Sequence, residues 1–334
     1  MEAWVEQLQN SVNTLDRLKE YIDVTPEEEK AITTLNTKWG TTPYFASLMD
    51  RADPNCPVRR QVLPSMAETV NEYGVENYLI WKENRATDEV RPDSIARQYH
   101  DRVAFTVTDV CANYCRHCFR KELVVDRDIK FRMDIEEGLA WIKEHKEIRD
   151  VLITGGDPFI LSDEKIEYLI RKLREFEHLE MIRFGTRTPI VLPQRITPEL
   201  KKILSPYHKI PLWINTQCNH PKEITDETAR AVFDLLSCGV NVGNQAVLLK
   251  GINDDPETFR LLHQKLLTVE KGAELIRDAI RGHTTGLAQP MYVIATNIGK
   301  IPLMPDYYIM GKNDKEYTLR NYEGKLTKWP NMPE

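Results

Sequence analysis

The sequence predicts an α/β fold with a parallel sheet, preceded by a helical N-terminal extension. From about Arg102 onward, short apolar runs rich in β-branched residues alternate with amphipathic stretches, whereas the first 95 residues are charged and helix-forming. Strands that alternate with helices pair in parallel through right-handed crossovers, which gives either a doubly wound sheet or a βα barrel. In both folds, ligands bind at the carboxyl ends of the strands.

Five strands and four helices are expected in the core of the chain. Apolar, β-rich runs predict strands at Arg102–Thr108, Asp150–Thr154, Met181–Gly185, Pro211–Thr216 and Asn241–Leu249. Amphipathic runs, several of which open on a capping residue, predict helices at Asp134–Lys146, Asp163–Glu177, Thr197–Leu204 and Thr225–Cys238. We therefore divide the chain into a helical extension at residues 1–95, a barrel core at 96–268 and a C-terminal arm at 269–334.

The composition is that of an ordinary globular protein. The chain has 334 residues, of which 41% are hydrophobic and 29% are charged, and its net charge is -6. No run approaches the roughly 20 apolar residues of a membrane span, and the acidic, amphipathic start is unlike a signal peptide. We therefore expect a cytoplasmic protein. Because no basic stripe is interleaved with aromatic residues, a nucleic-acid partner is not expected.

Three of the six cysteines lie within the eight-residue run CANYCRHC, as Cys111, Cys115 and Cys118. Such crowding is typical of metal-binding thiolates in a reducing compartment. Three thiolates at this spacing can hold a [4Fe-4S] cluster and leave one iron open to a ligand. A structural zinc site normally takes four protein ligands, and His117, adjacent to Cys118, is expected to point elsewhere. Zinc and three unligated thiols are the alternatives.

Further polar motifs follow the other predicted strands. The cysteine loop follows the first strand, and the rest are Gly155-Gly156-Asp157-Pro158, Thr186-Arg187-Thr188-Pro189, Asn215-Thr216-Gln217 and Asn244-Gln245.

CxxxCxxC followed by a Gly-Gly-acid-Pro segment resembles the radical S-adenosylmethionine (SAM) superfamily. In that superfamily SAM chelates the open iron, and one electron from the cluster cleaves SAM to a 5'-deoxyadenosyl radical. The resemblance implies a partial, open βα barrel. It also implies that Gly155, Gly156 and Asp157 expose backbone to the methionine amino group of SAM.

A narrower resemblance covers most of residues 40–310. Seven segments are similar, in order and spacing, to the lysine 2,3-aminomutase family: DPNCPVRRQ, DRVAFTVTDVCANYCRHCFRK, LITGGDP, GTRTPIVLPQRIT, NHPKEIT, GNQAVLLKGIND and RGHTTG. Family members use SAM and pyridoxal 5'-phosphate (PLP) to move an amino group between C2 and C3 of an amino acid. The resemblance implies an isomerase with a small-molecule amino acid as its substrate, L-lysine by family default. It further implies an electron donor such as flavodoxin or ferredoxin, and a homo-oligomer.

The same resemblance implies roles for five further residues. Lys300, in IGKIPLMPDY, matches the lysine that carries PLP, and Tyr99 and Arg102 match residues that bind the PLP phosphate. Arg120 matches the residue that meets the substrate carboxylate, and Gln245 matches one that contacts SAM. Each position also has a purely structural interpretation, as a solvated charge or as packing near the site.

The chain departs from the family pattern after about Thr268. It runs directly into TVEKGAEL where the family has a sixth barrel strand and a loop, so we expect five strands. The missing segment carries one of two carboxylates that bind the distal ammonium of lysine, and the other maps near Ala295. A buried ammonium without an anion is costly. Gln217 also stands where family members tend to have His.

These departures leave alternatives to the lysine aminomutase. The first is a radical SAM enzyme of the same lineage that does not use PLP or that isomerises another substrate. The others are an iron-sulfur or zinc binding module without enzymatic activity, and an inactive relative.

Overall fold

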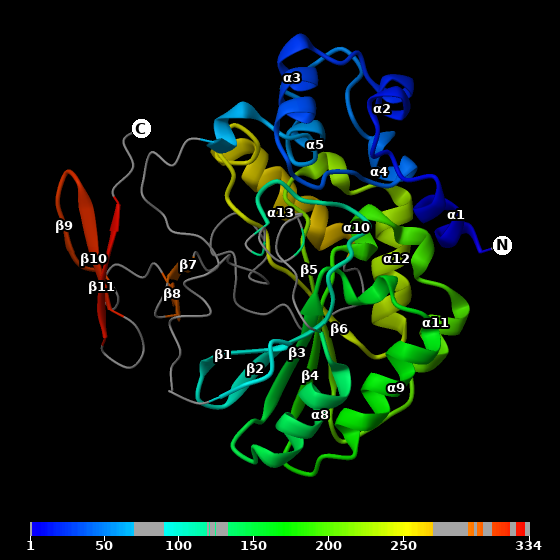
Figure 1. Ribbon diagram of the computed structural model, residues 1–334, viewed down its shortest axis with the longest axis vertical. Coiled ribbons are helices and arrows are strands. Elements are labelled where there is room, and N and C mark those ends of the chain that lie inside the picture. The colour runs from blue at the N-terminus through cyan, green and yellow to red at the C-terminus, as the bar shows by residue number, and fades with distance from the viewer. Residues whose placement is uncertain are drawn as a thin grey trace. The chain divides into compact units, whose positions relative to one another are not determined.

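The computed structural model describes residues 2–69, 90–118, 120, 124, 133–269, 293–296, 299–302, 309–320 and 325–330. The chain forms two compact units (Figure 1). The first comprises Met1–Val70, Val90–Ala96 and Asp101–Lys271, and the second comprises the rest of the chain. The cysteine loop belongs to the first unit, and Lys300 belongs to the second. The division of the chain at residues 95 and 268 stays a prediction.

A six-stranded sheet forms the centre of the fold, in the order β1-β2-β3-β4-β5-β6. The strands are β1 (Ile95–Tyr99), β2 (Arg102–Thr108), β3 (Asp150–Gly155), β4 (Met181–Gly185), β5 (Leu212–Thr216) and β6 (Asn241–Asn244). Strands β2 to β6 pair in parallel. Only two residues join β1 to β2. A connection this short allows the two strands to pair only in the antiparallel direction. No pair closes the described strands into a full barrel, so the predicted open α/β architecture is confirmed, with five parallel strands in the part of the chain that the structure describes.

Four of the five predicted strands agree with the structure to within one residue. The fifth prediction, Asn241–Leu249, is wrong beyond Asn244. The Gln245 amide still donates to the Thr216 carbonyl at 2.8 Å, but the Val247 amide turns to Oδ1 of Asn219, also at 2.8 Å. A side chain therefore replaces the neighbouring strand as the acceptor, which an apolar run cannot reveal. Strand β1 was not predicted.

Six helices and three 3-10 turns follow the sheet strands or connect them. They are α8 (Ile135–Glu144), α9 (Asp163–Arg174), α10 (Thr188–Val191), α11 (Pro198–Leu204), α12 (Asp226–Ser237), α13 (Pro256–Val269), η2 (Pro158–Ile160), η3 (Pro193–Arg195) and η4 (Pro221–Glu223). Asp134, Thr197 and Thr225 cap α8, α11 and α12, which explains why the predicted helices begin one residue early. Helices α9, α11 and α12 lie along one side of the sheet (Figure 1).

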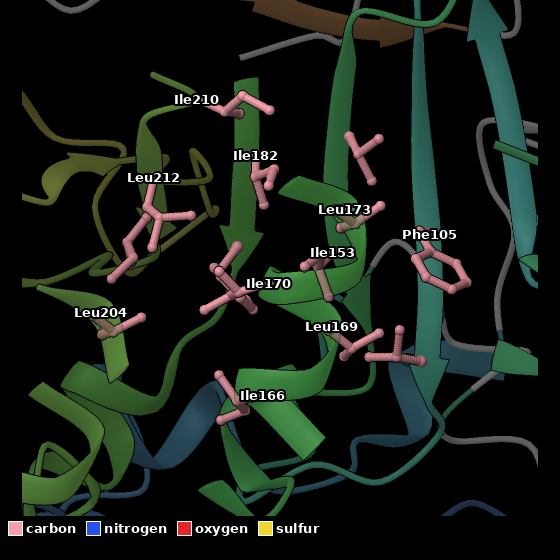
Figure 2. Close-up of a cluster of buried hydrophobic side chains, with 14 of the residues drawn as sticks. Phe105, Ile153, Ile166, Leu169, Ile170, Leu173, Ile182, Leu204, Ile210 and Leu212 are labelled. Carbon is pink, nitrogen blue, oxygen red and sulfur yellow. The ribbon is translucent and has the colours of Figure 1, made fainter. Parts of the chain in front are cut away.

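The main core lies between the sheet and α9 (Figure 2). Strand residues such as Phe105, Ile153 and Ile182 are fully buried, and they meet the apolar face of α9. That face repeats at three- and four-residue spacing, through Ile166, Leu169, Ile170 and Leu173. Burial of each such side chain contributes about 1.5–3 kcal/mol, so this layer holds the sheet rigid beneath the carboxyl ends of its strands.

The N-terminal extension is helical in its described part, as predicted. Its elements are α1 (Ala3–Gln9), α2 (Leu15–Tyr21), α3 (Pro26–Thr34), α4 (Pro43–Ala46), α5 (Pro57–Arg60) and η1 (Met66–Thr69). They share a second apolar core with Ala112 of the cysteine loop and with Ile190 of α10. Backbone carbonyls of the extension accept the Tyr114 and Arg116 amides, each at 2.9 Å. The extension thus fixes the loop from outside the sheet.

The described part of the second unit consists of the end of β1 and of short strands from the C-terminal part of the chain. Strands β7 (Val293–Thr296) and β8 (Gly299–Pro302) form an antiparallel pair in which Ala295 faces Lys300 in register. Strands β9 (Ile309–Lys312), β10 (Glu316–Arg320) and β11 (Leu326–Pro330) form an antiparallel sheet. Across all the described ranges, no helix has the length and apolar character needed to cross a membrane.

Candidate iron-sulfur site

The three motif cysteines lie on one loop that begins where β2 ends. None of the three is in a disulfide and all are partly exposed, and Cys111 and Cys118 pack against Val124. Burial raises the pKa of the Cys111 thiol well above its usual value, and the nearby Cys118, Asp157 and Cys115 add to this effect. A positive metal centre would reverse this cost, because metal-bound thiols are deprotonated.

The donor set suits a cluster better than a single ion. Among the described residues, no three Cys, His, Asp or Glu side chains converge as the ligands of one metal ion would. Ligands of a zinc ion must meet at one point, whereas the thiolates of a cubane bind different irons. Three thiols on one loop at the carboxyl edge of a parallel sheet therefore fit a [4Fe-4S] cluster.

Gly155 and Gly156 allow the end of β3 to touch the cysteine loop. The Gly156 amide donates to the Thr108 carbonyl at 2.6 Å, and the Asp157 amide donates to the Val110 carbonyl at 2.8 Å. A Cβ on Gly156 would lie 2.0 Å from the Val110 oxygen, and one on Gly155, whose φ is 133°, would lie 2.2 Å from the Thr108 oxygen. Because an ammonium group only donates hydrogen bonds, a contact with the methionine ammonium would fall to carbonyl oxygens of this segment.

Asp157 joins the ends of β3 and β4. Its buried carboxylate accepts bonds from the Thr186 hydroxyl at 2.5 Å, the Arg187 amide at 2.8 Å and the Phe159 amide at 3.0 Å. Burial raises the pKa of Asp157, while these donors act in the opposite direction. Its side chain therefore orders the loops around the site rather than facing a ligand.

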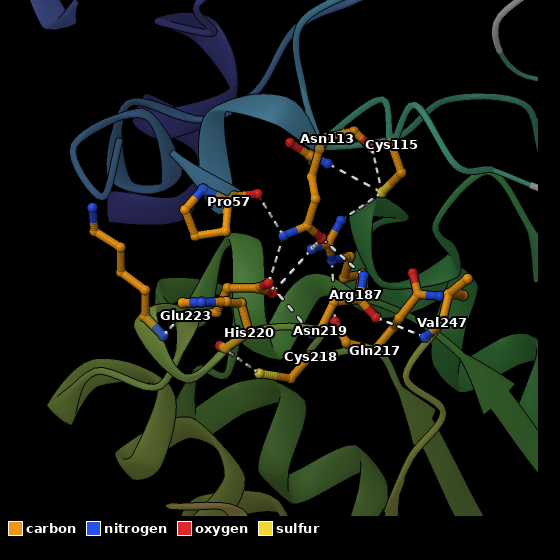
Figure 3. Close-up of polar contacts among 12 residues, drawn as sticks. Pro57, Asn113, Cys115, Arg187, Gln217, Cys218, Asn219, His220, Glu223 and Val247 are labelled. Carbon is orange, nitrogen blue, oxygen red and sulfur yellow. Dashed lines mark hydrogen bonds and ion pairs between the residues drawn. The ribbon is translucent and has the colours of Figure 1, made fainter. Parts of the chain in front are cut away.

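Arg187 connects the cysteine loop with a buried polar network (Figure 3). Its Nη1 lies 2.8 Å from Sγ of Cys115, and its Nη2 donates to Oε2 of Glu223 at 2.9 Å and to Oε1 of Gln61 at 2.7 Å. Burial lowers the pKa of the guanidinium, but Cys115 and Glu223 outweigh this and hold that pKa above its usual value. Asn219 completes the network with a 2.8 Å bond to Gln61.

We predicted no role from the sequence for the members of this network. Gln61 ends the segment DPNCPVRRQ, Asn219 and Glu223 lie in NHPKEIT, and Arg187 lies in GTRTP. All four positions fall in segments that carried the family resemblance, and Arg187 also lies in a polar motif that follows a predicted strand. Charge and hydropathy patterns do not indicate that a glutamine, an arginine and a glutamate far apart in the chain will meet.

Arg120 and Gln217 lie beside the same edge of the sheet. Nη1 of Arg120 contacts the Thr154 hydroxyl and lies 3.5 Å from the Gly155 carbonyl, at the end of β3. Oε1 of Gln217 pairs with Nε2 of His117 at 3.1 Å. The side chain of His117 therefore turns toward the loop after β5. We expected from the sequence that His117 would not be a metal ligand and would point elsewhere.

The remaining predicted residues are spread over other parts of the fold. Gln245 directly follows β6 and is exposed, so it lies at the carboxyl edge with the cysteine loop. Arg102 pairs with Asp101 at 2.9 Å. Because Arg102 begins β2 and the cysteine loop follows the end of β2, the strand separates the two by about 20 Å at roughly 3.3 Å per residue. Tyr99 ends β1. Lys300 lies in β8, and its side chain lies outside what the structure describes.

Comparison with known proteins agrees with this architecture. A family model described as the radical SAM superfamily matches residues 105–262, which span the parallel sheet from β2 to α13. A second family model, described as lysine-2,3-aminomutase, matches residues 277–334. The fold and the cysteine loop thus define a radical SAM protein.

Curated relatives narrow the family. The chain is 40% identical to L-lysine 2,3-aminomutase of Clostridium subterminale, over 97% of this chain and 83% of the relative. It is 40% identical to L-lysine 2,3-aminomutase of Bacillus subtilis, over 98% of this chain and 74% of the relative. It is 36% identical to glutamate 2,3-aminomutase of Clostridioides difficile, over 98% of this chain and 82% of the relative. The chain therefore belongs to the lysine 2,3-aminomutase family, and it is an aminomutase, an isomerase that acts on a small molecule.

Membership of this family implies which cofactors the protein uses. Radical SAM enzymes use a [4Fe-4S] cluster and SAM, and lysine 2,3-aminomutases depend on PLP as a family. The alignment with the Clostridium subterminale protein extends over 352 positions, so part of that relative stands opposite gaps in this 334-residue chain. Whether those gaps remove a sixth barrel strand stays a prediction, because residues 270–292 lie outside the described ranges.

Proposed function

We propose that this chain moves an amino group between C2 and C3 of an amino acid, with a [4Fe-4S] cluster on Cys111, Cys115 and Cys118. The observation that carries the proposal is the loop itself. Its three thiols stand at the carboxyl edge of an open parallel sheet, and the Gly155-Gly156 backbone braces the loop from β3. An electron donor such as flavodoxin or ferredoxin, a homo-oligomer and a cytoplasmic location stay predictions.

In this proposal the chain's own residues hold, orient and shield the cofactors and the substrate. When bound, the cluster and SAM supply a radical strong enough to remove hydrogen from carbon, and PLP makes the amino group able to migrate. The carbonyls of Gly155 and Gly156 accept from the ammonium of SAM, and Gln245 contacts SAM from the end of β6. The Arg120 guanidinium, at the end of β3, binds the substrate carboxylate as a paired anion.

The family resemblance assigns the PLP aldehyde to Lys300 and the PLP phosphate to Arg102 and Tyr99. A guanidinium and a phenol suit a phosphate dianion, and a lysine amine can bind the PLP aldehyde reversibly. Arg102 has a half-exposed side chain whose Nε is bonded to Asp101, so a phosphate would share it with that carboxylate.

L-lysine is the proposed substrate by family default. By the family resemblance, one of the two carboxylates that bind the distal ammonium of lysine maps near Ala295, in β7, which is not acidic, and one relative is named glutamate 2,3-aminomutase. An enzyme of this lineage with another substrate, or without PLP, is the alternative.

The deciding experiment combines reconstitution with product analysis. The protein is loaded anaerobically with iron and sulfide, and then given SAM, dithionite, PLP and either lysine, glutamate or a mixture of other amino acids. Mass spectrometry should detect a β-amino acid in one of these reactions. Cys111→Ala, Cys115→Ala and Cys118→Ala should each lose the cluster absorbance and SAM cleavage, whereas Cys238→Ala should keep both. An intact [4Fe-4S] spectrum in Cys115→Ala would contradict the assignment.

Lys300 needs its own test. Borohydride reduction followed by peptide mapping should find PLP attached to Lys300. Lys300→Ala should still cleave SAM but should form no β-amino acid. Labelling of a different lysine, or product formed by Lys300→Ala, would favour the alternative without PLP.

A further inference from the structure

Arg187 is a buried cation from outside the cysteine loop that contacts the loop directly. It follows β4, and only 7% of its side chain is exposed. Its Nη1 approaches Sγ of Cys115 at 2.8 Å, and its Nε donates to the Gln217 carbonyl at 3.1 Å. The guanidinium also lies over the Phe45 ring, 5.3 Å from its centre. No role in SAM, PLP or substrate binding accounts for this contact with a thiol.

The guanidinium cannot turn away from Cys115, because its other partners are fixed. Glu223 is fully buried, and its Oε1 accepts from Nε2 of Gln61 at 2.8 Å while its Oε2 takes Arg187. Gln61 is itself bonded to the Pro57 carbonyl and to Asn219. A planar fork with fixed partners on two sides presents its remaining N–H groups in one direction. Here that direction is Sγ of Cys115 (Figure 3).

We propose that Arg187 is a positioning residue that raises the reduction potential of the cluster through its charged hydrogen bond to Cys115, and that Glu223 limits this effect. Reduction adds one electron from a low-potential donor to the cluster and moves no proton. The added negative charge is stabilised by an adjacent cation, and hydrogen bonds to cluster sulfurs favour the reduced state. The buried Glu223 carboxylate offsets part of the same charge. This inference rests on the proposed cluster assignment.

Another buried arginine of the chain supplies a matched control. Arg195 is also fully buried, it donates to the Phe159 and Leu161 carbonyls, and it pairs with Asp163 at 2.7 Å. In the part of the chain that the structure describes, its guanidinium contacts carbonyls, a carboxylate and the Trp4 ring rather than a cysteine. Replacement of Arg195 therefore tests the general damage caused by loss of a buried guanidinium.

The test is the midpoint potential of the reconstituted cluster, measured by a dithionite titration followed by electron paramagnetic resonance without SAM, PLP or substrate. Arg187→Gln should shift the potential in the negative direction by enough to lower the reduced-to-oxidised ratio about tenfold, or about 59 mV for one electron. Glu223→Gln should shift it in the positive direction. Opposite signs are not expected from structural damage, which would affect both variants alike.

Two further variants keep the test decisive if a single substitution prevents folding. Arg187→Lys keeps the charge but cannot reach Cys115 and Glu223 together, so its potential should fall between those of the wild type and Arg187→Gln. Arg195→Lys should leave the potential unchanged. Equal potentials in wild type, Arg187→Lys and Arg187→Gln, each with full iron and sulfide content, would overturn the inference. Wild-type protein that binds no cluster would instead overturn the proposed function.

Discussion

Replacement of Gly156 by alanine should both destabilise the protein and prevent it from holding iron. The new Cβ would lie 2.0 Å from the Val110 oxygen, whereas ordinary contacts begin at about 3.4 Å. The cysteine loop and the end of β3 must therefore move apart by at least about 1 Å. That movement breaks the bonds from the Gly156 and Asp157 amides to the loop, which are 2.6 and 2.8 Å long.

The size of the effect follows from these contacts. Two backbone hydrogen bonds contribute about 0.5–1.5 kcal/mol each, and the strain of moving a packed loop adds a similar amount, so the loss is about 3 kcal/mol. Gly239 is the matched control. Its φ is 75° and a Cβ there would meet nothing within 4 Å, so Gly239→Ala has only the left-handed backbone penalty of about 1–2 kcal/mol.

Urea unfolding of the metal-free protein measures the stability difference, and iron content after reconstitution measures the cluster site. Gly156→Ala should unfold at lower urea than Gly239→Ala and should bind little iron, whereas Gly239→Ala should bind as much iron as the wild type. If both variants lost the same stability and retained the same iron, the close approach of β3 to the cysteine loop would not support the site as argued.

Three further substitutions, and Glu29→Ala as a control, test the surroundings of the site by chemical unfolding. Glu28→Ala leaves the fully buried Arg59 without its 2.5 Å carboxylate partner and should cost about 3 kcal/mol or more, whereas Glu29→Ala, in an exposed pair, should cost less than about 0.5 kcal/mol. Tyr44→Phe loses a 2.6 Å bond to the cap of α12, at about 1 kcal/mol. Burial raises the pKa of Tyr44 above 10.0, so above pH 10 the unfolded chain loses the phenol proton before the folded protein does. The stability of the wild type should therefore fall above pH 10, and Tyr44→Phe should not show this fall. Asn253→Ala leaves three buried backbone partners unmatched and should cost about 2 kcal/mol; a neutral result would show that water replaces them.

The sequence was sufficient where neighbouring residues carry the information. Side chains that alternate or repeat along one segment mark the strands β2 to β5 and the four predicted helices. Capping residues such as Asp134 and Thr225 mark the starts of helices. The cysteine loop is also local, because three thiols within eight residues must lie close together in any fold. The family followed from such segments, and the comparisons confirmed it.

The tertiary structure decided which distant residues support the loop. Gly155 and Gly156 were expected to face SAM, yet their first physical role is to let β3 meet the backbone of the cysteine loop. Gln61, Arg187 and Glu223 come from α5, the end of β4 and η4, and no local pattern links them. Their bonds depend on the burial of three separate segments against one another. A sequence specifies such contacts only through the whole fold, because each polar group is satisfied by whichever partner packing brings within reach.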